Sequence, residues 1–548
     1  MNLPFKKKPT SAPVFVGYIA TICIALWAGV PVQSQTTTGR VPNSSSASLP
    51  NLGDGTDLTP AAERRIGDRI ARELYRDPDY VDDAILQEYV DGIWQPLLAA
   101  ARQRGDLPPE LDETYAWEIL LGRDRSVNAF ALPGAYFGLH LGLVGVVTSR
   151  DELASVLAHE LSHVTQRHIA RSMERQSQQT PWLIGAMILG VLAASKSNSA
   201  DSTQAANAVI VGGQALGVQS QLNFSRDMER EADRMGFAVA TQAGYAPQGF
   251  VSMFGKLAQA SRLNDAGNFP YLRSHPLSTE RMADMQSRID LAAGADTTEP
   301  VRQNVTEPDQ AMLAARARVL SNTAVEALRT VIAQGLENAL TRATPAQRAG
   351  ALYGACLAAM RLRDFAQAQS FWRQLEVLVK SDAPALRQAR LLGVELALAQ
   401  GQAQQAQVLL AMAAPTSAMA RRTDMLLGAR VALLRTNPSG SPATNPDAGL
   451  AAVAQDLQTW VAGHGRDAQA WQQLASVYEV QGRTLHAIRA QGEASAAQMD
   501  FPAALARFKA AQDWVRKNAA TVDHFEASIV DTRARQVEST VREQAQER

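Results

Sequence analysis

The chain has little cysteine: its 548 residues contain only Cys23 and Cys356. Cys23 lies in a segment that we expect to be cleaved off, so Cys356 remains alone and cannot form an internal disulfide. The mature protein must therefore fold without covalent cross-links, even in an oxidising compartment. We expect Cys356 to be a buried free thiol.

An excess of charge and a long apolar run are also missing. The sequence has 53 Lys and Arg against 54 Asp and Glu, so no surplus of basic residues is present to hold a phosphate backbone, and we expect no nucleic-acid partner. No apolar run reaches the about twenty residues of a membrane-spanning helix, which argues against a membrane-embedded protease. The length indicates at least two globular domains.

The first 34 residues have the pattern of a cleaved export signal. Lysines at positions 6–8 precede an apolar run over residues 14–27, and Val32 and Ser34 provide small residues for cleavage. A retained membrane anchor is the alternative, but the run is short for a bilayer. Residues 35–56 are rich in Ser, Thr, Asn, Gly and Pro, which predicts a flexible leader before the first folded domain.

Residues 57–173 predict helices around a few strands. Ile66, Ile70 and Leu74 have helical spacing, with Thr59 or Asp57 as the candidate N-cap. A second helical pattern runs through residues 81–93. The short apolar segment 115–121 and the mixture of aromatics, valines and glycines in 135–147 are typical of strands. A long amphipathic helix is predicted for residues 151–173.

Two apolar segments, residues 181–194 and 208–217, are separated by a polar linker. Each segment is too short to span a bilayer. They form either a buried helical hairpin or a mobile flap that contacts a membrane or covers a cleft. The residues leave both alternatives open.

The C-terminal half is rich in Ala, Gln and Leu and is predicted to be helical after a linker at 293–309. A turn followed by a small residue recurs four times, as Asp364-Phe365 with Ala368, Gly401 with Ala406, Gly482 with Ala487, and Asp500-Phe501 with Ala504. The best single match to a tetratricopeptide repeat is formed by Trp471, Leu474, Ala475 and Tyr478.

We therefore expect degenerate tetratricopeptide-like repeats over residues 310–530 and a charged tail over 531–548. A generic Ala-rich helical bundle is the alternative. Stacked helix pairs of the repeat type form a concave surface that is suited to holding another polypeptide.

His159 and His163 are four residues apart, so on a helix their imidazoles project from one face about a turn apart. This geometry suits two zinc ligands, and Glu160 can take a proton from a water whose pKa the zinc lowers. The neighbouring residues are apolar, and two buried histidines with a carboxylate would be costly without a metal. The segment predicts a hydrolytic zinc site with Glu160 as a catalytic residue.

A third protein ligand must come from elsewhere, and residues 227–233 are the candidate segment. Glu229 and Asp233 are four residues apart and share one helical face. We assign Glu229 as the third zinc ligand and place Asp233 in the catalytic site, where its carboxylate orients a ligand histidine. Glu231 points away from both and is expected to be a surface or salt-bridge residue.

These two motifs together resemble the CAAX-prenyl-protease-like gluzincin metallopeptidases. The segment 128–134 (Asn-Ala-Phe-Ala-Leu-Pro-Gly) resembles the strand and turn before the active-site helix of that family, and Ser274-His275-Pro276 with Arg281 resembles its late motif. The resemblance is firm from about residue 58 to 292. It implies a mainly α fold, in which a zinc metalloprotease domain with a small β-sheet occupies residues 57–292 and precedes the helical repeats.

What the resemblance implies is a zinc endopeptidase with one Zn²⁺ per chain in the periplasm of a Gram-negative bacterium. It would degrade unfolded or misassembled outer-membrane proteins and assist their assembly at the outer-membrane barrel assembly machinery. Peripheral contact with a membrane surface is compatible with this role. The rival hypothesis is a chaperone or scaffold that uses the repeats and cleaves little.

His275 and Arg281 have two readings each. The resemblance implies that His275 is a fourth zinc ligand that keeps the enzyme latent by displacing water, whereas the alternative is that it only opens the turn at Pro276. Arg281 either stabilises a developing oxyanion or pairs with an acidic neighbour. His168 lies five residues after His163, about 140° round a helix, so we exclude it as a ligand and expect it at a helix end or on the surface.

The substrate is expected to bind as an extended strand against an edge formed by Ala135, Tyr136, Phe137, Gly138, Leu139 and His140. His140 lacks helical spacing to the zinc motif, so a packing role is expected for it. Ala135 stands where the family often has a second glycine, which puts the local backbone conformation in doubt.

Overall fold

A computed structural model describes residues 58–175, 225–263, 271–294, 306–413, 420–436 and 447–546. The predicted export signal, the leader, the two apolar segments and most of the linker lie outside these ranges. Residues from Thr56 to Arg548 belong to one compact unit. The predicted fold class is confirmed, because helices surround a single four-stranded sheet in the described ranges. None of the helices described there is long and apolar enough to cross a membrane.

The sheet consists of β1 (Tyr80–Val81), β2 (Glu118–Gly122), β3 (Ala129–Leu132) and β4 (Tyr136–His140) in the order β1-β2-β4-β3. β2 and β4 are parallel, with Ile119 opposite Phe137, and the other two pairs are antiparallel. The predicted edge at 135–140 is therefore wrong. β4 forms ladders on both sides, so its backbone groups are already paired, and β1 and β3 form the edges.

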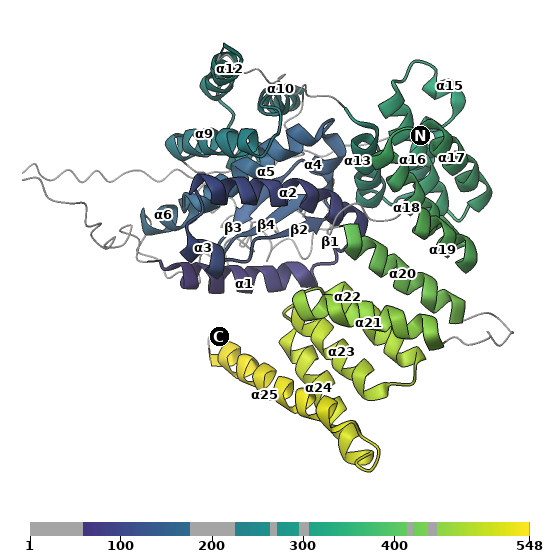
Figure 1. Cartoon of the computed structure of the whole chain (residues 1–548). Coiled ribbons are helices and arrows are strands. Elements are labelled where there is room, and N and C mark those ends of the chain that lie inside the picture. Colours follow the sequence, from purple (N-terminus) through teal and green to yellow (C-terminus); the bar gives the residue numbers. More distant parts are fainter. Residues whose placement is uncertain are drawn as a thin grey trace, which may run out of the picture. The chain divides into compact units, whose positions relative to one another are not determined.

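Helices cover both faces of the sheet (Figure 1). On one face α1 (Pro60–Arg76) contributes Ile70, which lies in one cluster with Leu120 and Tyr136. On the other face Phe137 lies in one cluster with residues of α2 (Ala84–Arg104) and α5 (Arg150–Thr165). Thr59 caps α1 as predicted, since its side chain accepts from the Ala62 amide.

Two predicted boundaries in this region are wrong. The second helix begins at Ala84 after Asp83, which caps it, while Val81 belongs to β1. The segment 135–147 contains β4 and then α4 (Leu141–Val146) in place of strands around a turn. Nearly all of α4 is buried, and a short helix that is apolar on every side has no periodicity to distinguish it from a strand.

The remaining helices before the linker are α3 (Pro109–Thr114), α5 (Arg150–Thr165), α6 (His168–Arg175), α9 (Arg226–Gln242), α10 (Gln248–Leu263), α11 (Tyr271–Ser274) and α12 (Thr279–Gly294). The helices after it are α13 (Pro308–Ser321), α14 (Val325–Gln334), α15 (Glu337–Leu340), α16 (Pro345–Arg361), α17 (Phe365–Leu378), α18 (Ala383–Ala399), α19 (Ala403–Met412), α20 (Ala420–Thr436), α21 (Asp447–Gly463), α22 (Ala468–Val480), α23 (Thr484–Ala497), α24 (Phe501–Lys517) and α25 (His524–Gln546).

The four predicted turns in the C-terminal half all lie between two helices. Asp364 and Asp500 cap α17 and α24, and Gly401 and Gly482 have φ angles of 75° and 70° at the starts of the loops before α19 and α23. A positive φ is the conformation that glycine adopts without strain. Consecutive helices contact one another as pairs, and the assignment of these pairs to tetratricopeptide repeats stays a prediction.

The expected tail at 531–548 is helical as far as Gln546, because it continues α25. Val530, Ala534 and Val537 are buried at helical spacing, and the last two pack with Phe508 of α24. An amphipathic stripe was thus present among the charged residues of this segment. Cys356 is a fully buried free thiol, as expected.

Candidate metal centre

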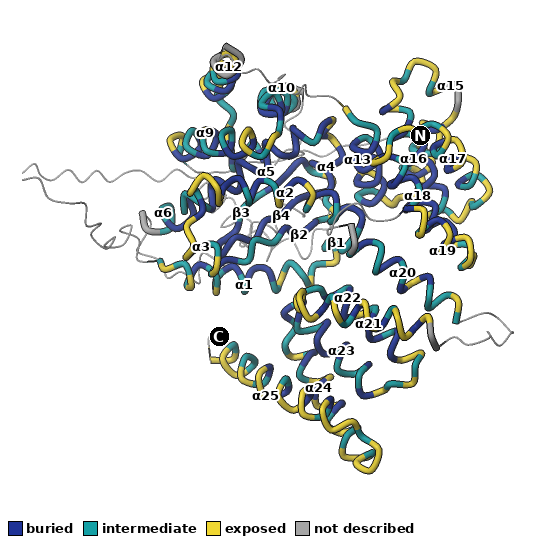
Figure 2. The backbone as a smooth tube through the Cα atoms, in the orientation of Figure 1, coloured by how far each residue is buried: buried dark blue, intermediate teal, exposed yellow. Residues whose placement is uncertain are grey.

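Helix α5, which carries His159, Glu160 and His163, is buried from Asp151 to Val164 (Figure 2). Ser149 caps its N-terminus by accepting from the Glu152 amide. His159, Glu160 and His163 are therefore held in the interior of the protein on one rigid helix.

The predicted single helix over 151–173 is wrong, because the chain breaks between α5 and α6. Arg167 has a left-handed φ of 52°, and its guanidinium donates to Glu63 at 2.7 Å. A buried carboxylate therefore holds the break in place. As a result, the side chain of His168 points toward His163. In a continuous helix it would point away from His163.

Helix α9 lies against α5, and a close approach of the two backbones sets their distance. A Cβ on Gly236 would lie 3.0 Å from the backbone of Ala158 and His159, so only glycine fits without a shift. This contact places Glu229 and Asp233 beside the two histidines, and both carboxylates are buried.

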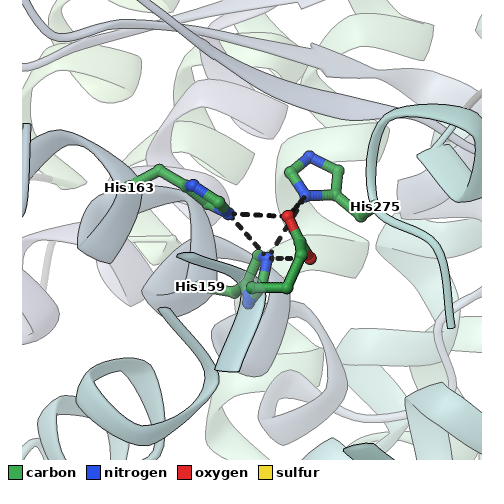
Figure 3. A group of neighbouring side chains, drawn as sticks. His159, His163 and His275 are labelled. Carbon is green, nitrogen blue, oxygen red and sulfur yellow. Dashed lines mark hydrogen bonds and ion pairs between the residues drawn. The ribbon is translucent and has the colours of Figure 1, made fainter. Parts of the chain in front are cut away.

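Four side chains bring ligand atoms within 4.8 Å of one another: His159, His163, Glu229 and His275. We call them the metal group. His159 Nε2 lies 3.0 Å from His163 Nε2 and 3.3 Å from His275 Nδ1. Glu229 Oε1 lies 3.0 Å from His275 Nδ1 and 3.4 Å from His163 Nε2. The three imidazoles point toward a common centre in Figure 3.

These spacings fit a tetrahedral zinc site. Four ligands at about 2.0–2.1 Å from one zinc ion lie about 3.3 Å from one another, which is close to the separations within the metal group. Three imidazole nitrogens and one carboxylate oxygen are also a donor set that zinc prefers. In the described part of the chain, neither carboxylate oxygen of the buried Glu160 makes a hydrogen bond of good geometry. Buried polar atoms of this kind are expected where an ion or water belongs.

Asp233 lies directly behind His159, the first of the proposed ligands. Its Oδ1 lies 3.0 Å from His159 Nδ1, which leaves Nε2 of that ring facing the metal group. Burial alone would raise the pKa of Asp233, but hydrogen bonds from Arg281 and His159 hold it below its usual range. A carboxylate behind a ligand histidine fixes the ring and raises its basicity.

Arg281 forms ion pairs with acidic neighbours, which is the second of the two alternatives considered for it. Its Nε and Nη2 donate to the two oxygens of Asp233 at 2.6 and 2.8 Å, and its Nη1 lies 2.8 Å from Glu229 Oε2. Arg281 is itself buried. One cation thus neutralises the outer side of both carboxylates, while Glu229 Oε1 faces the histidines.

Glu160 is placed beside the metal group without belonging to it. Its Oε1 lies 3.4 Å from His275 Nε2. Burial raises the pKa of Glu160, and the neighbouring His275 and His159 oppose that effect. Tyr271 stacks on His275 with ring centroids 4.6 Å apart and so helps to hold that ring. Nothing in the sequence pattern had drawn attention to Tyr271.

His168 begins α6, so the helix-end alternative is the correct one, and it lies outside the metal group. It is fully buried, so the surface alternative is wrong. Its Nδ1 lies 2.9 Å from His163 Nδ1, and its Nε2 lies 3.1 Å from Glu231. Burial lowers the pKa of His168 to about 4, against the opposing effect of Glu231. Glu231 is a salt-bridge residue, as predicted, and also pairs with Arg171.

His140 and Ala135, the other two residues discussed in the sequence analysis, lie in and next to the sheet. His140 is buried at the end of β4, with its Nδ1 2.9 Å from the hydroxyl of Ser126, in agreement with a packing role. Ala135 has a φ of 57°, next to Gly134 at 71°. The conformation that glycine would adopt freely is thus imposed on an alanine, at a cost of order 1 kcal/mol.

Comparison with known proteins identifies the region that contains these residues. Residues 93–289 match the profile of peptidase family M48. This part of the chain is a peptidase family M48 domain. The predicted recognition is thereby confirmed, and zinc as the cofactor agrees with both the family and the donor set of the metal group.

Curated relatives extend the match. The beta-barrel assembly-enhancing protease of Escherichia coli is 29% identical over 331 residues, which are 59% of this chain and 62% of that protein. A Vibrio cholerae protein provisionally given the same name is 37% identical over 242 residues, or 44% of this chain and 47% of that one. The mitochondrial metalloendopeptidase OMA1 of Saccharomyces cerevisiae is 27% identical over 201 residues, which are 36% of this chain and 54% of that protein. The match thus spans about half to three fifths of each relative.

Proposed function

We propose that the protein is a zinc-dependent endopeptidase of the cell envelope. The observation that carries this proposal is the buried convergence of His159, His163 and Glu229 beside the carboxylate of Glu160. When bound, zinc supplies a Lewis acid that polarises a carbonyl and lowers the pKa of water. His159, His163 and Glu229 would hold it, and Glu160 would take the proton from the attacking water and pass it to the leaving amine.

The substrate is proposed to bind as an added strand along β3, the edge that replaces the one predicted at 135–140. β3 lies next to α5, whereas the backbone of β4 is paired on both sides. An edge strand offers unpaired backbone groups to an extended peptide. A substrate on β3 would therefore lie next to α5, the helix that carries Glu160.

The enzyme is proposed to be latent in the arrangement described above. His275 contributes a fourth ligand atom and lies 3.4 Å from Glu160, in the space that a reacting water needs. A zinc site with four protein ligands is typical of structural sites, while catalytic sites keep one position open. Displacement of His275 would open that position.

The relatives' names support the choice of substrate. Two of them are named for enhancing the assembly of beta-barrels, and we propose misassembled outer-membrane barrel proteins as substrates and the barrel assembly machinery as a partner. We also propose that the protein acts in the periplasm, where peripheral contact with a membrane surface is compatible with this role. The helix pairs of the C-terminal half favour a second candidate function, a scaffold that holds unfolded barrels with little cleavage.

The test is proteolysis of an unfolded outer-membrane barrel by the zinc-loaded full chain. Glu160→Gln should lower the cleavage rate by at least about a hundredfold, since it removes the general base. His275→Ala should raise the rate, since it opens a ligand position. Zinc content is measured in each variant, because a loss of metal would mimic a loss of base.

The outcomes separate the hypotheses. Full activity of Glu160→Gln with zinc bound would contradict the proposed mechanism. Lower activity of His275→Ala with zinc bound would contradict latency and make His275 part of the active form. Rescue of barrel assembly in cells by Glu160→Gln would favour the scaffold.

A further inference from the structure

A chain of buried side chains leads from the metal group to the protein surface through His168. His163 Nδ1 lies 2.9 Å from His168 Nδ1, and His168 Nε2 lies 3.1 Å from Glu231 Oε2. Arg171 donates to the same oxygen of Glu231 at 3.0 Å. The side chains of His163 and His168 are 0% exposed, whereas those of Glu231 and Arg171 are 38% exposed.

The positions of the protons in this chain follow from the ligand geometry. His163 faces the metal group with Nε2, so the hydrogen of its neutral ring is on Nδ1. That Nδ1–H donates to His168 Nδ1, which must accept and therefore carries no hydrogen. The hydrogen of His168 is then on Nε2, where it can be donated to the Glu231 carboxylate. Each donor meets one acceptor only if His168 is neutral in this one tautomer.

The two ligand histidines are thus held by different chemistry. His159 has the Asp233 carboxylate directly behind it, whereas His163 has a neutral imidazole, with the carboxylate of Glu231 one ring further away. We propose that His168 is a positioning residue for zinc binding, which fixes the orientation of His163 through its Nδ1 and is itself fixed by Glu231. This inference rests on the proposed zinc site and assigns a function to a residue outside the metal group.

The fold contains a specific device that places His168. The break between α5 and α6 depends on the left-handed φ of Arg167 and on its hydrogen bond to Glu63, which is 3% exposed. A backbone in this conformation is costly for a residue other than glycine. This conformation of Arg167 interrupts the helix, so that His168 Nδ1 lies next to His163 Nδ1.

The test measures zinc affinity of the full chain by competition with a chromophoric chelator. His168→Leu removes the acceptor and should weaken zinc binding about 10- to 100-fold, the usual effect of losing a partner behind a ligand histidine. His168→Asn places an amide oxygen near the position of Nδ1 and should recover most of the affinity, to within about threefold of the wild type. A role in packing alone would give no such rescue, because asparagine is smaller than leucine.

The control is His140→Leu, which removes a buried histidine of the same region that also lies 2.9 Å from a partner, Ser126. Its zinc affinity should match the wild type. An unchanged affinity in His168→Leu, or equal losses in His168→Asn and His168→Leu, would overturn the inference. Absence of zinc binding in the wild type would instead overturn the proposed function, so the two failures are distinguishable.

A second measurement applies even if the His168 variants do not fold. Long-range ¹H–¹⁵N spectra of the zinc-loaded wild type, labelled at its 8 histidines, report the tautomer of each ring. The inference requires a neutral His168 with hydrogen on Nε2 and a His163 with hydrogen on Nδ1. Hydrogen on Nδ1 of His168 would overturn it.

Discussion

Two clusters of ionisable side chains, one buried and one largely buried, differ in the source of the positive charge that compensates their carboxylates. In the metal group, three imidazoles and Glu229 Oε1 converge on one point, and Arg281 reaches only the outer sides of Glu229 and Asp233. The second cluster, which we call the arginine cluster, joins acids at the start of α2 to three arginines of later helices. Its acids are Asp82, Asp83 and Glu88, and its arginines are Arg316, Arg387 and Arg422.

The arginine cluster supplies its own cations. Arg316 donates to both oxygens of Asp83 and to both oxygens of Glu395, at 2.7–2.8 Å. Bidentate Arg–carboxylate pairs of this kind are among the strong ion pairs in proteins. In the arginine cluster, arginines of the chain itself compensate the negative charge of the carboxylates. In the metal group, the ligand atoms converge on a point where a zinc ion would supply the positive charge.

The largest effect is expected from breaking the arginine cluster. Arg316→Leu removes a buried cation and leaves the largely buried carboxylates of Asp83 and Glu395 without their counter-ion. Loss of one partner of a buried pair costs about 3–5 kcal/mol. Denaturant unfolding of the full chain measures this loss. It should be the same with zinc and with a chelator, since Arg316 does not touch the metal group.

The control is Arg329→Leu, which breaks an ion pair with Glu326 whose side chains are 65% and 82% exposed. Exposed pairs contribute at most about 1 kcal/mol. If both variants lost the same stability, burial of the arginine cluster would have no energetic consequence, contrary to the comparison.

Removal of zinc should have the next largest effect and should act on the metal group alone. A ligand that binds only the folded state at 100 times its Kd stabilises that state by about 2.7 kcal/mol. A chelator should lower the free energy of unfolding by about that amount at this zinc concentration. In His159→Ala the chelator should have little effect, and an equal effect there would show that zinc stabilises the fold elsewhere.

The local motif of the metal group was predictable from the sequence because it depends on helix periodicity. His159, Glu160 and His163 lie on one helix, and Glu229 and Asp233 on another, so spacing alone places each set on one face. Whether these helices touch was not predictable in this way. That contact depends on Gly236 at the crossing point, and a glycine in a helix is no sign of a partner.

The errors share a physical cause. His168 lies outside the metal group, as predicted, but the argument for its exclusion assumed a continuous helix, and that helix is interrupted at the left-handed residue Arg167. The misplaced edge strand arose because strand order is a tertiary property, so the sequence of β3 and β4 does not say which one is central. The arginine cluster was not foreseen either, since its partners are more than two hundred residues apart.

The smallest predicted effect concerns a carboxyl group at the rim of the arginine cluster. Arg387 is shared between Glu88 and Asp424, and burial raises the pKa of Asp424 to about 6 against the attraction of Arg387. The unfolded chain ionises Asp424 near pH 4, so between about pH 4 and 6 the folded state binds more protons. Stability from this group is therefore lost as the pH rises through that window.

Asp424→Asn should remove that loss, so the variant should gain stability relative to the wild type between pH 4 and pH 7. Asp83→Asn is the matched contrast. Burial alone would raise the pKa of Asp83, but Arg316 holds it below its usual range, so stability from Asp83 is present above about pH 4 and is lost in acid. Asp83→Asn should therefore be less stable than the wild type at pH 4 to 7 by a nearly constant amount, and this difference should shrink as the pH falls below about 4. Denaturant unfolding at pH 3, 4 and 7 checks both variants. If Asp424→Asn also lost its difference from the wild type only below pH 4, Asp424 would be compensated by Arg387 as fully as Asp83 is by Arg316.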